Sequence, residues 1–304
     1  MLRALGMGDL LVSVPALRAL RAAFPGTRIT LAAPAGLREL VALTGAVDDV
    51  LPTSGLGALQ WRHEPPSVAV NLHGGGPQSL ADLVATRPAR LFTHAHPDYP
   101  AVGGPCWRTG VHETRRWCDL LAHYGIPADR YDLGLARPEV PSPAPGAVVV
   151  HPGAAYGARR WPVDRYAAVA RALAERGHRI VVTGDARERE LAEAVGGEVL
   201  AGATGLTELA ALVADASLVV CGDTGAGHLA TAYGTPSVLV FGPVPPWQWG
   251  PPPGTRDRHA VLWSGRAGEP FTDEPDPGLL RITAADVLAA ADGLTGPRRA
   301  TRLR

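Results

Sequence analysis

The sequence contains no lysine, so arginine supplies all 29 of its basic residues, and 29 acidic residues bring the formal net charge to zero. Without an excess of either sign, nothing in the composition attracts a polyanion, and we expect no nucleic-acid partner. Long apolar runs are also missing: no segment approaches the ~20 residues of a spanning helix, and arginines interrupt the opening that a signal peptide would occupy. The composition therefore predicts a soluble, cytoplasmic protein without an integral membrane segment.

Cysteine is scarce, and the three that occur, Cys106, Cys118 and Cys221, are widely spaced and form no CxxC pair. An odd number at such spacing gives no disulfide framework and favours a reducing compartment. Patterns that would hold a metal are equally incomplete. The segment 112–116 reads HETRR and lacks the second histidine of a zinc helix, and no further ligand is spaced to join the histidines and aspartate of 94–98. We therefore predict no metal site.

Strand-like and helix-like segments alternate along most of the chain. Apolar residues recur every three to four positions in the helical segments, and short apolar runs bounded by turn residues mark the strands. Strands are expected at 28–33, 67–72, 147–151, 179–183, 217–221 and 237–241, and helices at 10–24, 36–43, 163–176, 187–195, 207–214 and 227–233. This alternation predicts an α/β protein built from βαβ units around parallel sheets.

A proline-rich segment divides this pattern in two. Four prolines fall within residues 137–146, which makes the segment stiff, extended and unable to pair in a central strand. We interpret it as a linker between two doubly wound, Rossmann-like domains, at 1–140 and 147–304, and leave open that the last helix packs back on the first domain. Ligands of such domains bind at the carboxyl ends of the parallel strands, so a cleft between the domains is the expected site.

A glycine turn opens the first domain, where residues 5–11 read LGMGDLL. The dinucleotide fingerprint GxGxxG is incomplete here, because Leu11 replaces its third glycine and no acid ends the second strand at Ala33, so a nicotinamide enzyme is not favoured. The turn presents Gly8 and Asp9 to the expected cleft. Asp9 has two open interpretations: a cap of the following helix, for which aspartate is favoured, or a catalytic base.

The segment 219–230, VVCGDTGAGHLA, ends an apolar strand in an acid, a hydroxyl and glycines. Such a turn leaves backbone N–H groups and the start of the next helix facing the cleft, which is typical of an anion site. Gly225 and Gly227 would let a phosphate approach the backbone closely. Asp223 would hold the loop or bond a sugar hydroxyl, and His228 would donate to a phosphate or sugar. A plain βα turn with a capping acid is the alternative.

Two further loops favour a ligand over that alternative. Residues 234–243 form another strand that ends in a glycine turn, next to the first. Residues 151–162, HPGAAYGARRWP, run from a strand end to Arg159 and Arg160 just before a helix. Arginine opposes the dipole at a helix N-terminus, so its presence there indicates a bound anion. A solvated loop with extended arginines is the other interpretation.

Four segments taken in order resemble glycosyltransferase family 9, the ADP-heptose heptosyltransferases and their relatives. They are LRALGMGDLLVSVPALRALRAAFP at 2–25, HPGAAYGARRWP at 151–162, VVTGDARERELAEAV at 181–195 and CGDTGAGHLATAYGTPSVLVFGP at 221–243. The resemblance covers nearly the whole chain, and its most specific part is DTGxxH followed by GTP and FGP. It implies the GT-B fold, with the acceptor bound by the first Rossmann-like domain, the donor nucleotide by the second, and no metal.

The resemblance also assigns roles to individual residues. It implies that Asp9 is the base that takes the acceptor hydroxyl proton. The donor-binding residues it implies are Arg159, Arg160, Glu188, Asp223, Thr224, Gly225 and His228. The glycine-rich loop at 71–78 is expected to line the acceptor side, where we place Gly8, Asn71, His73, Gly75 and Gln78.

The function that the resemblance implies is metal-independent, inverting transfer of a sugar to an acceptor hydroxyl, with heptose from ADP-heptose as the favoured donor. No cofactor is needed beyond this nucleotide-sugar co-substrate, and the acceptor is a glycan or a small molecule. The alternatives are a nucleotide-sugar epimerase or hydrolase, and a non-catalytic sugar-nucleotide-binding protein. Only Met1–Leu5 precede the glycine turn, so we expect either a very short central strand or a start that lies upstream.

Overall fold

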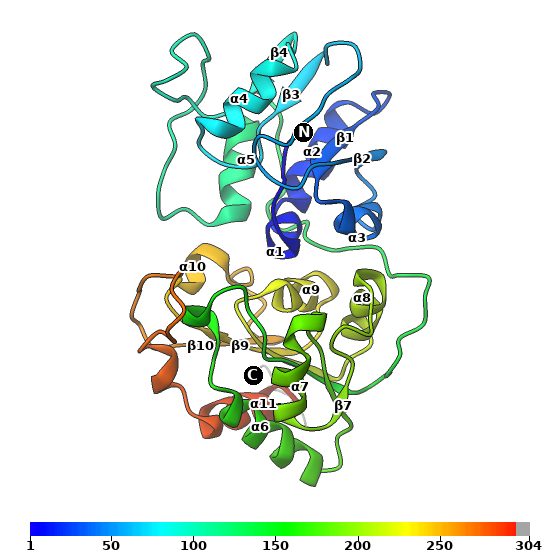
Figure 1. Cartoon of the computed structure of the whole chain (residues 1–304), viewed down its shortest axis with the longest axis vertical. Helices are drawn as coiled ribbons and strands as arrows, with labels where there is room; N and C mark the ends of the chain where they lie inside the picture. Colours follow the sequence, from blue (N-terminus) through cyan, green and yellow to red (C-terminus); the bar gives the residue numbers. More distant parts are fainter. Residues whose placement is uncertain (296–304) are drawn as a thin grey trace, which may run out of the picture. The chain divides into compact units, whose positions relative to one another are not determined.

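The computed structural model describes residues 1–295 and divides the chain into two compact units (Figure 1). The N-terminal unit comprises Met1–Pro138 together with Trp247–Trp249, and the C-terminal unit comprises Glu139–Pro246 with the described residues from Gly250 onward. Residues 296–304, which end the predicted second domain, lie outside the described residues. Both units are built from parallel strands and helices, as the alternation in the sequence predicts.

The N-terminal unit has a parallel sheet whose central strand is almost absent. Its elements are β1 (Thr30–Ala33), β2 (Asp49–Pro52), β3 (Val68–Val70), β4 (Arg90–Phe92), α1 (Met7–Leu11), α2 (Val14–Ala23), α3 (Arg38–Ala42), α4 (Gln78–Ala85) and α5 (Glu113–His123). The strands pair as β1 with β2 and β3 with β4, and Leu2 alone bridges Ala32 on one side and Asn71 on the other. This bridging residue marks a very short central strand, which is one of the two possibilities expected from the sequence.

A cavity of about 210 Å³ lies beside this short strand. Residues of β1 and β3 line it together with Leu20 of α2, Phe24 just after α2 and Leu83 of α4. The apolar side chains that face the cavity lack packing partners on that side.

The single helix predicted at 10–24 is wrong, because two helices occupy this segment. α1 ends at Leu11 and α2 begins at Val14. Pro15 lies at the second position of α2, where it has no N–H to donate and would clash with the carbonyl one turn earlier if the helix continued through it. The Ser13 hydroxyl donates to the Leu10 carbonyl at 2.7 Å and closes the turn between the two helices.

The C-terminal unit is a six-stranded parallel sheet in the order β10-β9-β8-β5-β6-β7. Its strands are β5 (Val148–His151), β6 (Ile180–Val182), β7 (Glu198–Val199), β8 (Leu218–Gly222), β9 (Ser237–Phe241) and β10 (His259–Trp263). Its helices are α6 (Val163–Glu175), α7 (Arg189–Val195), α8 (Leu206–Ala214), α9 (Gly225–Tyr233) and α11 (Ala284–Thr295), and a short α10 (Pro246–Trp249) runs into the segment grouped with the N-terminal unit. The order of strands reverses between β5 and β8, which creates a topological switch point there.

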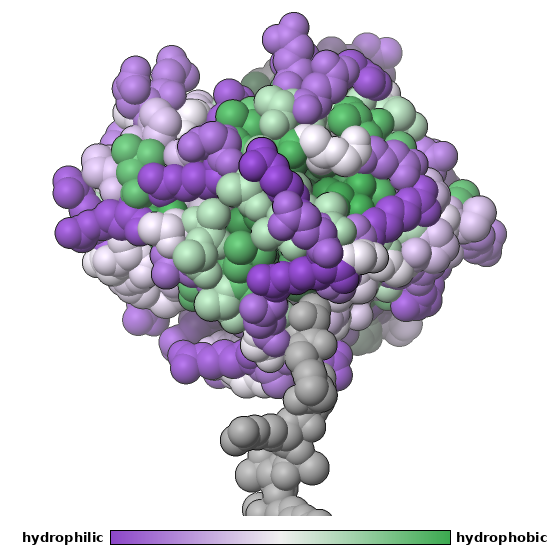
Figure 2. Space-filling model, turned by 90° about the horizontal axis from the view of Figure 1, so that it is seen from below, coloured by the Kyte–Doolittle hydropathy of each residue, from purple (hydrophilic) through white to green (hydrophobic). Residues whose placement is uncertain are grey.

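Helices cover this sheet in two groups. α6 contacts α7 and α11, whereas α8 contacts α9, and α11 also packs against β9 and β10 of its own unit. The face of this unit in Figure 2 carries hydrophobic patches separated by hydrophilic side chains. Within residues 1–295, no helix combines the length and the apolar character needed to cross a bilayer.

The buried His259 makes the stability of this unit depend on pH. The buried His259 ring shares a 2.8 Å hydrogen bond with the Ser237 hydroxyl, and burial lowers its pKa to about 4. A group with a lowered pKa binds fewer protons when folded than when unfolded, so its contribution is complete above about pH 6.5 and is lost as the pH falls toward 4.

We therefore expect the melting temperature to fall by several degrees between pH 7 and pH 5, and to fall less steeply in His259→Gln. Thermal denaturation followed by circular dichroism across this range measures both slopes. Other buried histidines, including His94, contribute to the total, so the difference between the two proteins is the informative quantity. Equal slopes would show that His259 does not titrate on unfolding.

Candidate functional site

The switch point between β5 and β8 places two loops of the C-terminal unit next to each other. The strands are parallel neighbours, with His151 opposite Cys221 at their carboxyl ends. The segment 152–162 leaves β5, and Asp223 and Thr224 leave β8. All the predicted donor-binding residues lie in these two segments or at the start of α9, apart from Glu188, which follows β6. The sheet therefore brings together residues that are more than 60 positions apart in the sequence.

The helix after β8 begins at Gly225, two residues earlier than the sequence predicts, with Thr224 as its N-cap. Thr224 is extended, at φ −141° and ψ 173°, and its side chain makes no capping hydrogen bond. Gly227, expected to admit a phosphate, also allows the helix to pack closely: a Cβ there would lie 3.0 Å from Leu239 and 3.3 Å from the Cys221 sulfur. The N–H groups of Gly227 and His228 donate to the Thr224 carbonyl, so the free N–H groups of the first turn are those at the start of the helix, from Gly225.

Arg159 and Asp223 form a largely buried ion pair beside this helix end. The Arg159 Nη2 donates to the Asp223 carboxylate at 2.8 Å and to the Asp223 carbonyl at 2.6 Å. The side chains are 25% and 5% exposed, respectively, so the carboxylate is the more buried partner. The His228 Nε2 lies 4.0 Å from the other carboxylate oxygen. The structure thus brings Arg159, Asp223 and His228 together, as the sequence predicts.

Two buried donors at this pair lack an ordinary hydrogen-bond acceptor within residues 1–295. The Arg159 Nε has none, and the Thr224 hydroxyl has only a weak interaction with the Cys221 thiol. Buried polar groups are nearly always paired, so each unpaired donor calls for a specific explanation. A bound anion with several oxygens would satisfy both, and a helix N-terminus is the backbone element that favours such an anion.

The loop that carries Arg159 is fixed at several points. The buried Trp161 indole donates to the Ile282 carbonyl at 2.9 Å, and the Ala158 N–H donates to the Thr272 carbonyl at 2.9 Å. Gly157 packs so tightly on the segment after β10 that a Cβ there would lie 1.7 Å from the Asp273 carbonyl oxygen. Arg160 also holds the loop, because its Nε donates to the Ala154 carbonyl at 2.8 Å.

Glu188 lies in a polar cluster at the carboxyl ends of β5 and β6. Its Oε2 accepts a hydrogen bond from the Asp185 N–H at 2.9 Å, within a capping box. The carboxylate fills the space above Gly153, where a Cβ would lie 2.0 Å from Oε1. His151 shares a 3.0 Å hydrogen bond with Thr183, and burial lowers the pKa of His151 while Glu188 opposes that effect. Sequence reasoning missed His151 and Thr183, although both are polar residues at strand ends.

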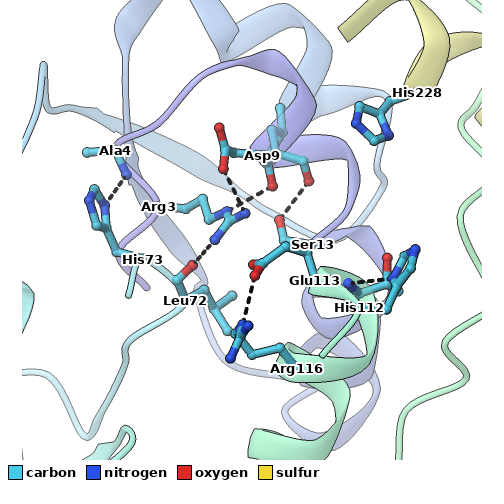
Figure 3. Close-up of polar contacts among 12 residues, drawn as sticks. Arg3, Ala4, Asp9, Ser13, Leu72, His73, His112, Glu113, Arg116 and His228 are labelled. Carbon is cyan, nitrogen blue, oxygen red and sulfur yellow. Dashed lines mark hydrogen bonds and ion pairs between the residues drawn. The ribbon is translucent and has the colours of Figure 1, made fainter. Parts of the chain in front are cut away.

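In the N-terminal unit, Asp9 does not cap a helix, so that interpretation is wrong. Gly6 is the N-cap of α1, no side chain caps this helix, and Asp9 lies in its first turn. The Asp9 side chain is 30% exposed and accepts a hydrogen bond from Arg3 at 3.2 Å (Figure 3). Sequence reasoning missed Arg3, whose signal is a charged residue inside an otherwise apolar strand.

The loop 71–78 is organised by Asn71, which is fully buried. The Asn71 amide donates to the Gly74 carbonyl and to the hydroxyls of Ser79 and Thr93, each at 3.1 Å, and its carbonyl accepts from the His73 N–H at 3.1 Å. Asn71 therefore shapes the loop from inside rather than facing solvent.

The other residues expected on the acceptor side differ in exposure. The half-buried His73 accepts from the Ala4 N–H through Nδ1 at 3.2 Å, and burial and Arg3 lower its pKa (Figure 3). The neutral ring thus carries its proton on Nε2. A Cβ at Gly75 would lie 3.0 Å from the Trp107 ring, so a larger residue there would require this ring to shift. Gln78 is exposed at the start of α4, and Gly8 lies half-buried within α1.

No metal-binding group emerges from the described part of the chain: residues 1–295 contain no cluster of three or more histidine, cysteine, aspartate or glutamate side chains arranged around a common point.

Comparisons with known proteins show which family the chain resembles. The profile described as glycosyltransferase family 9 (heptosyltransferase) matches residues 113–275, more than half of the chain. Lipopolysaccharide heptosyltransferase 2 of Escherichia coli K12 is 25% identical over 292 residues, covering 79% of this chain and 81% of its own.

Solved structures share the fold. A family 9 glycosyltransferase from Veillonella parvula superposes with a TM-score of 0.78 at 20% identity, covering 97% of this chain and 95% of its own. The E. coli heptosyltransferase WaaC with ADP-2-deoxy-2-fluoro heptose superposes with a TM-score of 0.70 at 21% identity, covering 96% of this chain and 98% of its own.

Removing Arg159 should destabilise the C-terminal unit, because Asp223 would be left as a buried carboxylate without its partner. We expect Arg159→Met to lower the free energy of unfolding by about 3 kcal/mol. Arg160→Met is the matched control, because Arg160 is exposed and bonds only its own loop, and it should cost less than about 1 kcal/mol. Urea denaturation of both variants provides the measurement. Similar small losses in both would show that the Arg159–Asp223 pair does not hold the loop.

Proposed function

The chain belongs to glycosyltransferase family 9, a family of sugar-transferring enzymes, and from this premise we propose that it transfers heptose from ADP-heptose to an acceptor hydroxyl, with inversion and without a metal ion. The C-terminal unit would bind the donor and the N-terminal unit the acceptor. The two units would correspond to the predicted domains 1–140 and 147–304. Three free cysteines within the described residues support a reducing, cytoplasmic setting.

The pair of unpaired buried donors at the start of α9 is the observation that carries the donor assignment. A diphosphate would accept from the Thr224 hydroxyl and the Arg159 Nε, and its charge would favour the N-terminus of α9. The bound ADP-2-deoxy-2-fluoro heptose of the WaaC structure is a sugar diphosphate of this kind. Oε1 of Glu188, which the capping box does not use, would bond a ribose hydroxyl.

The proposed reaction breaks the bond between the anomeric carbon and the diphosphate as the acceptor oxygen forms a new bond to that carbon from the opposite face. Asp9 accepts the proton that the acceptor hydroxyl loses. The departing diphosphate gains negative charge, which Arg159 and the N–H groups of α9 stabilise. Attack from the face opposite the leaving group inverts the configuration of the anomeric carbon.

Replacing Thr224 with valine tests the donor site with little disturbance to the fold. Valine keeps the β-branched shape and suits the extended backbone, and it removes a buried hydroxyl that has no ordinary partner, so stability should not fall. We expect ADP affinity to drop about tenfold, because a hydrogen bond to a charged phosphate is lost. Isothermal titration calorimetry with ADP, UDP and GDP measures this loss and the base preference.

Ser217→Ala is the matched control for this change. Ser217 also has a buried hydroxyl without a partner, but it lies at the opposite, amino end of β8. We expect this variant to bind ADP as the wild type does. Unchanged ADP affinity in Thr224→Val, or no binding of any nucleoside diphosphate by the wild type, would contradict the donor site.

Replacing Asp9 with asparagine should abolish transfer and leave donor binding intact. Asparagine keeps the size of the side chain but cannot accept the proton, so we expect the turnover number to fall by about 100-fold or more while ADP affinity is unchanged. Asp119→Asn, on the exposed side of α5, is the control and should retain full activity.

The assay follows donor consumption and glycosylated product with ADP-heptose and candidate acceptors. Donor consumption without an acceptor would indicate a hydrolase or epimerase instead. Donor binding with no turnover under any condition would indicate a sugar-nucleotide-binding protein. Full transfer activity in Asp9→Asn would exclude Asp9 as the base.

A further inference from the structure

Arg3 occupies a position where burial of a charge needs a specific reason. It follows Leu2 in the short central strand, and its side chain is only 1% exposed. Burial lowers the pKa of this guanidinium, while the neighbouring carboxylates of Asp9 and Glu113 oppose that effect. Taking a guanidinium out of water is costly unless its donors are satisfied with good geometry. An apolar side chain at the centre of the sheet would avoid this cost entirely.

Two of the three guanidinium nitrogens of Arg3 donate to the same residue, Asp9. Its Nε donates to the backbone carbonyl of Asp9 at 2.8 Å, and its Nη2 donates to the Oδ1 of the same residue at 3.2 Å. Its Nη1 donates to the Leu72 carbonyl, as Figure 3 shows. One planar fork thus holds both the main chain and the side chain of Asp9, and it ties them to the start of the glycine-rich loop.

Other groups hold the guanidinium itself in place. It lies over the ring of the buried Trp117, 4.9 Å from the ring centroid. Glu113 provides a negative charge nearby and is itself paired with Arg116 at 2.8 Å. The Trp117 face and the Leu72 carbonyl therefore hold the Arg3 guanidinium in addition to its contacts with Asp9.

The two oxygens of Asp9 end up in different situations. Oδ1 accepts from Arg3, whereas Oδ2 has no hydrogen bond to any residue among 1–295. Because the Asp9 side chain is 30% exposed, solvent or a ligand can reach it. Anchoring one oxygen removes rotation about the side-chain bonds and leaves a single oxygen with its lone pairs available.

We infer that Arg3 is a positioning residue, which fixes Asp9 so that Oδ2 is presented to the acceptor hydroxyl. This inference rests on the proposed function, in which Asp9 is the base. Lysine cannot replace the fork, because a single ammonium cannot reach a carbonyl and a carboxylate of one residue and a second carbonyl in the same planar geometry. The positioning therefore depends on the guanidinium shape as well as on the charge.

A double-mutant cycle separates positioning from general structural support. Arg3→Lys keeps the charge, and we expect it to lower the turnover number by about 10- to 100-fold, with ADP affinity and the KM for the donor unchanged. In the Asp9→Asn background the same substitution should change the residual rate by less than about threefold, since there is no base left to position. Arg3→Met should lose more activity than Arg3→Lys.

Each contrary result has a distinct meaning. Equal losses from Arg3→Lys in the two backgrounds, or no loss in the presence of Asp9, would overturn the inference. Full activity of Asp9→Asn would instead refute the proposed base, and the inference with it. If Arg3→Lys does not fold, Trp117→Phe provides the same test, because it weakens the contact that holds the Arg3 guanidinium. Trp117→Phe should lower the turnover number when Asp9 is present and leave the residual rate unchanged in the Asp9→Asn background.

Discussion

The cost of burying charge shapes both candidate sites, since each is built on an arginine–aspartate pair at the turn between a strand and a helix. Arg3 pairs with Asp9 after the central strand of the N-terminal unit, and Arg159 pairs with Asp223 after β8. The partner that is withdrawn from water differs. In the first pair the arginine is 1% exposed and the aspartate 30%, and in the second the arginine is 25% exposed and the aspartate 5%. The first pair thus offers a carboxylate to solvent and the second a guanidinium.

Much of the fold can be predicted from the sequence, because buried parallel strands appear in it as short apolar runs. β9 matches its predicted range of 237–241, and the α/β class with a GT-B-type fold is confirmed. Two boundaries failed for local reasons: Pro15 divides a continuous apolar periodicity into α1 and α2, and the extended Thr224 starts α9 early. The strands β2, β4, β7 and β10 and the helices α4 and α5 were not predicted; β4 and β7 are only three and two residues long, too short to give a clear apolar run.

The site was predictable in its location but not in its internal arrangement. The carboxyl ends of neighbouring parallel strands lie at the same edge of a sheet. The motifs at 151–162 and 221–230 follow β5 and β8, which are such neighbours, so they lie side by side. Which side chains turn inward depends on packing that no spacing reveals. Asn71 is buried within its loop, Gly227 serves the contact with Leu239, and Arg160 bonds the backbone of its own loop. Arg3 was not predicted as a site residue, because a charged residue in a strand contradicts the apolar pattern used to find strands.

The two candidate sites differ in which groups lack a hydrogen-bond partner, and this difference matches the proposed chemistry. Around α9 the unpaired groups are donors, the Thr224 hydroxyl and the Arg159 Nε. At Asp9 the unpaired group is an acceptor, Oδ2. Transfer of a sugar creates negative charge on a departing diphosphate and removes a proton from an attacking hydroxyl. Donors without a partner suit the first event and an acceptor without a partner suits the second, so each candidate site has the kind of group that its proposed substrate would engage.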